Sequence, residues 1–225
     1  MTKNSSYGKC NLCGARFNKS ALTRHLQSCK SGKGIARKPA GQSHSAKAGA
    51  LHLVVEGAGL PEYWMHIETP SSARLQDLDR FLRDIWLECC GHLSMFEIGG
   101  ERYASAAAEE MEAHSMKIQL VEALQPQMKF HYDYDFGTTT RLSLKLVAER
   151  EVESPRKSIA ILARNDPPPI ACGACGKPAA QVCAACAYTP EGWLCNACIP
   201  QHKCGDEMLL PAVNSPRVGQ CAYAG

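Results

Sequence analysis

The central part of the chain alternates between apolar runs of two different periods. Leu51, Leu53 and Val55 fall on one face of an extended segment, and the run from Tyr63 to Ile67, closed by Pro70, forms a second one. Both segments are expected to be strands. The period then changes, because apolar residues recur at three-to-four spacing over 72–89, which predicts one amphipathic helix. These residues are Leu75, Leu78, Phe81, Leu82, Ile85 and Trp86.

Signals at the ends of these segments define the remaining elements. Ser71 or Ser72 can cap the helix and Gly91 can end it. Residues 92–103 predict a strand interrupted by a Gly99-Gly100 turn, and residues 104–115 predict a helix or a mobile excursion. Residues 128–134 and 142–147 predict a hairpin that turns near Gly137. The expected fold class is α+β, with a mostly antiparallel sheet packed on one main helix.

Composition divides the 225 residues into four segments. Residues 1–30 contain a compact Cys/His unit, and residues 31–49 are rich in Gly, Ser, Ala and Lys, which predicts a flexible basic linker. Residues 50–165 have ordinary globular composition. Residues 166–225 begin with three prolines and then become rich in cysteine. The α+β domain is therefore expected to be flanked by two small modules.

The charge is distributed unevenly between these segments. Residues 1–50 hold ten Lys or Arg and no Asp or Glu, although the net charge of the whole chain is only +3. The rest of the chain is therefore acidic. A basic arm on an acidic body favours a polyanionic partner such as nucleic acid, and the alternative is a solubilising tail.

Four residues of the first segment have the spacing of metal ligands. Cys10 and Cys13 form a Cys-x-x-Cys pair, and His25 and Cys29, at i and i+4, share a helix face. Ser20 is a credible cap for that helix. The unit resembles the ββα zinc-finger family in its variant with Cys in the last ligand position. So small a unit needs its metal to fold.

Candidate nucleic-acid contacts lie on the finger helix and in the linker. On the exposed face of the helix, such fingers contact bases or phosphates. The candidates are Lys19, Thr23, Arg24 and Gln27 on the helix and Lys30, Lys33, Arg37 and Lys38 after it. The alternative is a finger that docks on protein.

A second set of ligands follows the prolines. Three Cys-x-x-Cys pairs and a His/Cys pair give eight ligands, enough for two closed zinc sites with no position left for water. The ligands are Cys172, Cys175, Cys183, Cys186, Cys195, Cys198, His202 and Cys204. Val182, Tyr188 and Trp193 are expected to pack between the sites.

The pairing of these eight ligands stays open at the level of sequence. Interleaving joins the first and third Cys-x-x-Cys pairs at one zinc, whereas sequential pairing joins neighbours. His202 and Cys204 are only two residues apart, so both can reach one metal only where the chain bends. Cys221 could therefore replace one of them as a ligand. Cys89 and Cys90 are expected to form a buried pair at the end of the main helix, with redox or metal chemistry as the alternative.

The central segment carries a family resemblance. The second strand with Trp64, the helix ending near Trp86, the block HLSMFEIGG from His92 and the turn YDYDFG from Tyr132 together resemble the plasmid pRiA4b ORF-3-like family, also known as a mobile-element passenger protein. The resemblance implies an α+β fold with a curved sheet and no settled activity. In that family the turn usually continues with acidic residues, a Trp and a His, where this chain has Thr138, Thr139, Thr140 and Leu142.

These observations favour a non-catalytic binding protein that holds about three zinc ions and engages nucleic acid. No nucleophile–base pair, phosphate loop or open metal site is visible. The alternatives are a protein-interaction adaptor and, less favoured, an enzyme with a pocket lined by His92, Glu97, Arg102, His131, Asp133 and Asp135. The apolar runs are too short for a membrane span and no secretory signal is visible, so a cytoplasmic protein with reduced thiols is expected. A small-molecule substrate is not expected.

Overall fold

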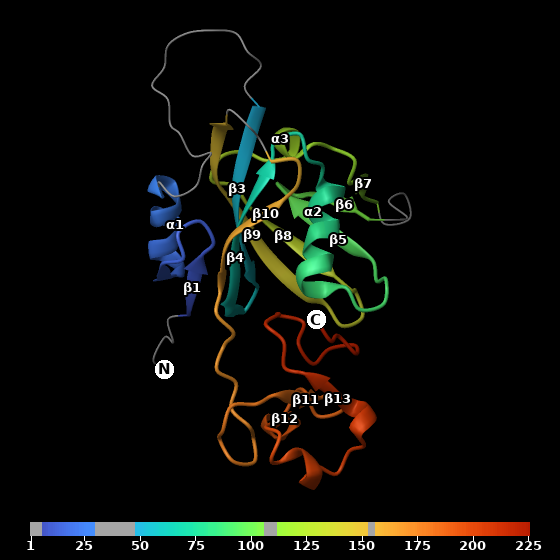
Figure 1. Ribbon diagram of the computed structural model, residues 1–225. Coiled ribbons are helices and arrows are strands. Elements are labelled where there is room, and N and C mark those ends of the chain that lie inside the picture. Colours follow the sequence, from blue (N-terminus) through green and yellow to red (C-terminus); the bar gives the residue numbers. More distant parts are fainter. Residues whose placement is uncertain (1–5, 30–47, 106–111, 153–155) are drawn as a thin grey trace.

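The computed structural model describes residues 6–29, 48–105, 112–152 and 156–225. Its main feature is a ten-stranded sheet with the strand order β2-β1-β10-β4-β3-β9-β8-β5-β6-β7, shown in Figure 1. Every neighbouring pair is antiparallel except β6 and β7. The strands are β1 (Tyr7–Cys10), β2 (Arg16–Asn18), β3 (Ala48–Gly57), β4 (Leu60–Pro70), β5 (Ser94–Ile98), β6 (Glu101–Ala104), β7 (His114–Ser115), β8 (Lys129–Tyr134), β9 (Thr140–Val152) and β10 (Ala160–Asn165). The molecule is therefore sheet-rich, as expected from the strand patterns.

Strand β4 is buried along both of its faces. Tyr63, Met65 and Ile67 point into the main core, whereas Trp64 points to the opposite side and is fully buried there. A strand with both faces covered reads as a continuous apolar run instead of an alternating one. Other parts of the protein must therefore pack against both faces of the sheet at β4.

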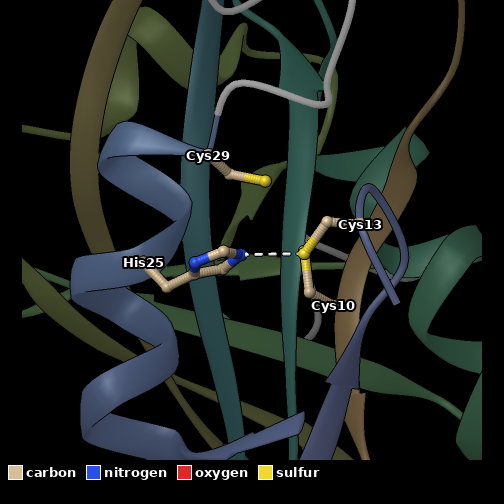
Figure 2. A group of neighbouring side chains, drawn as sticks. All are labelled: Cys10, Cys13, His25 and Cys29. Carbon is tan, nitrogen blue, oxygen red and sulfur yellow. Dashed lines mark hydrogen bonds between the residues drawn. The ribbon is translucent and has the colours of Figure 1, made fainter. Parts of the chain in front are cut away.

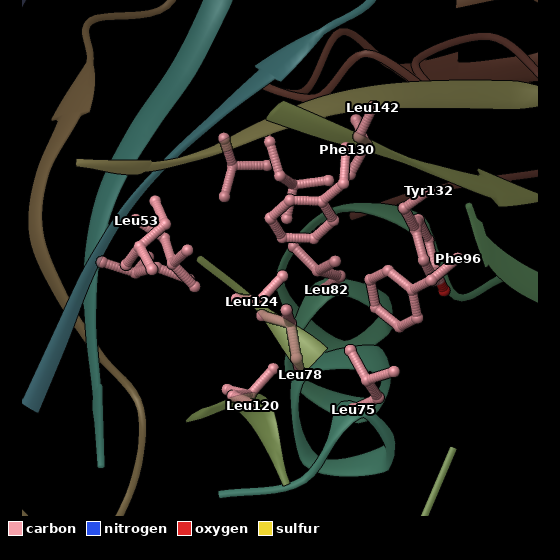
Figure 3. Packing of buried hydrophobic residues seen from close by; sticks show 14 of the residues in the cluster. Leu53, Leu75, Leu78, Leu82, Phe96, Leu120, Leu124, Phe130, Tyr132 and Leu142 are labelled. Carbon is pink, nitrogen blue, oxygen red and sulfur yellow. The ribbon is translucent and has the colours of Figure 1, made fainter. Parts of the chain in front are cut away.

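The main core lies between the sheet and the helical segment 75–87. The expected helix is α2 (Leu75–Leu82), which continues as a π-helical turn η1 (Arg83–Leu87). Leu75, Leu78 and Leu82 are buried with sheet residues such as Phe96 and Tyr132, as Figure 3 shows. The expected serine cap is wrong: the N-cap is Arg74, whose backbone N–H donates to the Asp77 carboxylate at 2.8 Å. A short helix α3 (Leu120–Ala123) adds Leu120 to the same core.

The two expected hairpins of the sheet are present. Gly99 and Gly100 both have positive φ (61° and 93°) and turn β5 into β6, which explains the glycine pair there. Strands β8 and β9 pair from Lys129 to Tyr134. Of the segment 104–115, residues 106–111 lie outside the described residues, as does almost all of the linker 31–49.

The N-terminal Cys/His unit has the element order ββα, and we call residues 7–29 the finger; this unit does not stand apart from the central domain. Helix α1 (Lys19–Ser28) follows β2, and β1 pairs with β10 from Gly8 to Cys10, so the finger extends the central sheet. Leu22 and Leu26 of α1 pack with Trp64 and Leu162 of the sheet. The finger therefore covers the face of β4 that the main core leaves open, as Figure 1 shows.

The C-terminal module, residues 171–211, has its own three-stranded sheet in the order β12-β11-β13. Its strands are β11 (Gln181–Cys183), β12 (Trp193–Leu194) and β13 (Leu209–Pro211), with short 3-10 turns η2 (Pro190–Gly192), η3 (Ile199–Gln201) and η4 (Asp206–Met208). Tyr188, expected inside this module, is 76% exposed. After β13 the tail, residues 212–225, returns to the central domain, where the Ser215 hydroxyl donates to the Trp86 carbonyl at 2.6 Å. The red tail lies between the two sheets in Figure 1.

Candidate metal centres

The four predicted ligands of the finger meet at one point. Cys10 ends β1, Cys13 lies in the turn after it, His25 is on α1, and Cys29 caps the end of that helix. Their donor atoms all lie within 4.8 Å of one another, and Figure 2 shows the side chains converging. The Sγ of Cys13 is 3.2 Å from Nε2 of His25.

Local structure holds the ligands of the finger in place. The His25 ring stacks on Phe17, with the ring centroids 4.4 Å apart. The expected cap Ser20 is wrong, because the Asn18 side chain accepts from the Ala21 N–H at 2.9 Å and so caps α1. Gly14, at a φ of 78°, closes the turn that brings Cys13 back towards Cys10.

The eight C-terminal ligands form two interleaved groups. The first joins Cys172 and Cys175 to Cys195 and Cys198, and the second joins Cys183 and Cys186 to His202 and Cys204. The sulfur atoms of Cys175 and Cys195 are 3.6 Å apart, and those of Cys186 and Cys204 are 3.8 Å apart. His202 follows the 3-10 turn Ile199–Gln201 in extended backbone, and this bend lets His202 and Cys204 reach the same point. Cys221 is not part of either group.

Each C-terminal group contains a thiol whose lowered pKa favours the thiolate, the form that binds metal. A hydrogen bond from the Cys195 backbone is the largest influence on Cys172 and helps to lower its pKa to about 6. Burial acts to raise the pKa of Cys183, but hydrogen bonds from His202 and backbone amides outweigh it and lower that pKa to about 7. Hydrogen bonds from Cys204 and Cys175 instead raise the pKa of Cys186 to about 11 and that of Cys198 to about 12.

The geometry fits zinc. Tetrahedral zinc with Zn–S bonds of about 2.3 Å separates its sulfur ligands by about 3.8 Å, which matches the sulfur pairs of the C-terminal module. Each group supplies four protein donors, so none leaves an open position for a catalytic water. The arrangement is that of structural metal sites.

The predicted nucleic-acid contacts occupy different environments. Lys19 forms an ion pair with Glu56 of the central domain, and the half-buried Thr23 donates its hydroxyl to the Lys19 carbonyl at 3.1 Å. Arg24 and Gln27 are exposed on α1. Lys30, Lys33, Arg37 and Lys38 lie outside the described residues.

The six polar residues considered for a central pocket do not converge on one cavity. Glu97, Arg102 and His131 lie at exposed sheet positions, and Asp133 is paired with Arg141 at 2.6 Å. His92 and Asp135 are 3.5 Å apart, beside the tail. An open groove lies elsewhere, lined by residues such as Arg80, Phe81 and Lys157.

Sequence reasoning missed a fourth Cys/His group. Cys89, Cys90, His92 and Cys221 also have donor atoms within 4.8 Å of one another. The expected buried pair is wrong, because Cys90 is exposed and Cys89 is only half-buried. The number of cysteines was the available signal, because the other three groups use ten of the thirteen and leave three unassigned.

Comparison with known proteins agrees with the central resemblance. None of the helices in the described residues is both long and apolar enough to cross a bilayer. No curated protein matches the chain. A solved structure, a protein of unknown function from Methanosarcina mazei Go1, is 19% identical, with a TM-score of 0.47 over 53% of this chain and 70% of its own. The sequence model of the family of plasmid pRiA4b ORF-3-like proteins matches residues 50–185, well over half of the sequence. The chain belongs to the plasmid pRiA4b ORF-3-like family.

Proposed function

We propose that the protein is a non-catalytic zinc protein that binds nucleic acid through its finger and the basic segment that follows. The Cys/His groups support the first part, because four protein donors at each metal leave no position for substrate or water. Zinc then serves to fix the shape of binding surfaces.

The single observation that carries the nucleic-acid proposal is the separation of charge. All ten basic residues of the first fifty stand without one acidic neighbour in that segment, whereas the whole chain has 25 Lys or Arg and 22 Asp or Glu. A cationic segment attracts phosphates by releasing their counterions, and the acidic remainder limits binding elsewhere.

The docking of the finger restricts which residues can take part. Lys19 faces the central domain and is paired with Glu56, so it supports the position of the finger. Arg24 and Gln27 point to solvent, as does Lys9 on β1. Because one finger covers only about three base pairs, its sequence selectivity is expected to be low. Phosphate contacts from Lys30, Lys33, Arg37 and Lys38 would supply most of the affinity.

Fluorescence anisotropy with a labelled duplex and a single strand of the same sequence tests this proposal across a salt series. The logarithm of the affinity should fall linearly with the logarithm of the salt concentration. The double variant Arg37→Glu/Lys38→Glu should reduce the slope by up to about 2 and weaken binding to both probes.

A matched control changes the same net charge elsewhere. Lys117 and Lys177 are exposed, on the central domain and the C-terminal module respectively. The variant Lys117→Glu/Lys177→Glu should keep the wild-type salt slope. Absence of binding at low salt, or equal losses in the two double variants, would refute the proposal.

A second candidate function is docking on a protein partner, favoured by the exposed side chains of the C-terminal module. Tyr188 is 76% exposed and Met208 is 40% exposed. Tyr and Met are enriched at protein interfaces. Tyr188→Ser should abolish a nuclease-resistant pull-down of such a partner and leave oligonucleotide binding unchanged; an unchanged pull-down would exclude Tyr188 as the contact.

A further inference from the structure

The fourth Cys/His group joins two segments that are far apart in sequence. Cys89, Cys90 and His92 lie between η1 and β5, and Cys221 comes from the tail, 131 residues beyond Cys90. We call these four residues the tail cluster. The Sγ of Cys90 is 3.4 Å from that of Cys89, 3.5 Å from that of Cys221 and 2.9 Å from Nε2 of His92. The Nε2 atom of His92 is 3.3 Å from the Cys221 sulfur.

We propose that the tail cluster binds a fourth zinc ion in a Cys₃His site. This proposal goes beyond the nucleic-acid function and does not depend on it. The spacings resemble those of the finger group, where a sulfur and a ring nitrogen are 3.2 Å apart. Three thiolates and one imidazole are a common donor set for structural zinc.

The count of ligands supports the assignment independently. With the tail cluster included, four groups of four use all thirteen cysteines and three of the eight histidines. Each group is complete and no cysteine is left over. A disulfide between Cys90 and Cys221 would instead leave Cys89 and His92 at the same point without a role.

The backbone that carries these ligands is held from outside the cluster. Arg83 donates to the His92 carbonyl at 2.7 Å, and the Glu88 carboxylate accepts from the Gly91 N–H at 2.6 Å. Gly91 has a φ of 76°, which the turn between Cys90 and His92 requires. Such contacts around the ligands fix their orientation before metal binds.

The surrounding charges also suit a metal with three thiolates, which carries a net negative charge. The buried Arg217 guanidinium lies 3.4 Å from the Cys89 sulfur and pairs with Asp135 at 2.7 Å. The Asp135 carboxylate is 3.5 Å from Nε2 of His92, and the Tyr134 hydroxyl is 3.9 Å from the Cys89 sulfur. Arg217 therefore balances both the thiolates and the carboxylate.

The site would tie the C-terminal tail to the central domain. The finger group and the two C-terminal groups each join residues that are close in sequence, whereas the tail cluster encloses the whole C-terminal module. The tail also contacts the central domain through Asn214 and Ser215. Zinc at Cys221 would thus fix the module against the central sheet.

Native mass spectrometry of the reduced full chain tests the proposal by counting zinc. Wild type should carry four ions, and Cys221→Ser and Cys90→Ser should each carry three. The matched control Ala224→Ser, at an exposed tail position, should keep four. In Cys221→Ser, hydrogen exchange should rise in residues 212–225 and stay unchanged in the finger.

A measurement on wild type covers the case in which a variant fails to fold. After cadmium-113 replaces zinc, nuclear magnetic resonance should give four signals, three from Cys₃His sites and one from a Cys₄ site. Three signals, a zinc count of three in wild type, or an unchanged count in Cys221→Ser would overturn the proposal. A Cys90–Cys221 disulfide that persists in the presence of a reducing agent would also overturn the proposal.

Discussion

The finger and the C-terminal module both gather cysteine and histidine ligands, but different interactions stabilise the two folds. The finger has one group of ligands and shares an apolar cluster with the central domain, in which Leu22 and Leu26 pack on Trp64 and Leu162. It also gives β1 to the central sheet. Apolar packing and strand pairing therefore both stabilise the finger, whether or not a metal is bound.

The C-terminal module has two groups of ligands and almost no core. Within residues 171–211, all described, the buried apolar side chains besides the cysteine ligands are Val182 and Leu194. Its strands pair only with one another. A core of that size cannot offset the conformational entropy of ordering the chain, so we expect the fold of this module to depend on metal. Two modules with similar cysteine spacing are therefore expected to depend on metal to different degrees.

The largest expected effect is the loss of a ligand in the C-terminal module. Cys183→Ser should release one zinc and abolish amide protection throughout 181–211, because structural zinc supplies about 10–16 kcal/mol of apparent binding free energy. Hydrogen exchange followed by mass spectrometry reports this segment by segment. Ala185→Ser, at an exposed neighbouring position, should leave protection intact. Protection that survives Cys183→Ser would mean that packing holds the module.

Removing the apolar anchor of the finger should have a smaller effect. Trp64 is fully buried, and truncation of such a residue costs about 3–5 kcal/mol. Trp64→Ala should therefore raise hydrogen exchange in β1 and α1 while the finger keeps its zinc. Loss of the zinc together with the protection would show that the finger does not fold without its docking surface.

A substitution at Gly8 should weaken the pairing of the finger strand β1 with the central sheet by a smaller amount. A Cβ atom at Gly8 would overlap the Arg164 carbonyl and the Trp64 ring. Gly8→Ala should destabilise the β1–β10 pairing by about 1–3 kcal/mol, the usual cost of overpacking. Gly137→Ala is the control, because its Cβ would come no closer than 3.4 Å to a neighbour. Equal thermal shifts in the two variants would contradict this view of the docking.

Acid should weaken the region beneath the finger through two buried histidines. His52 and His66 are 3.0 Å apart, and burial lowers the pKa of His52 to about 3 and that of His66 to about 4. Both stay neutral in the folded state, whereas the unfolded chain binds protons below pH 6.5. Stability is therefore lost as the pH falls below 6.5 towards 4, by about 1 kcal/mol for each histidine between pH 6.5 and 5.5.

Thermal unfolding across that pH range measures the effect in zinc-loaded protein. The double variant His52→Gln/His66→Gln should show a flatter dependence on pH than wild type, while protonation of the zinc ligands remains common to both. Identical pH dependence in the two proteins would show that this histidine pair does not control the response.

The sequence predicted features whose determinants lie close together along the chain. Cys-x-x-Cys pairs and the i, i+4 pair of His25 and Cys29 placed three groups of ligands, because each needs only a short turn or a helix face. Apolar periodicity likewise located β3, β4, and the helical segment 75–87. Local spacing cannot place Cys221 beside Cys90, since 131 residues of folded chain must bring them together.

The docking of the finger escaped prediction for a similar reason. The spacing of its ligands is typical of a finger that folds on its own. Strand β10, which pairs with β1, has the sequence AILARN, in which apolar and polar residues do not alternate clearly. The three consecutive apolar residues Tyr63, Trp64 and Met65 were the one usable signal, because a strand with an exposed face would alternate at these positions. Only the three-dimensional structure could identify the segment that covers that face of β4.

The closed groups of cysteine and histidine are expected to hold structural zinc. X-ray absorption at the zinc edge tests it most directly on purified, reduced protein. Each zinc should have three to four sulfur neighbours at about 2.3 Å, the rest nitrogen at about 2.0–2.1 Å, and no oxygen shell. One or more oxygen neighbours per zinc, or no bound zinc, would contradict it.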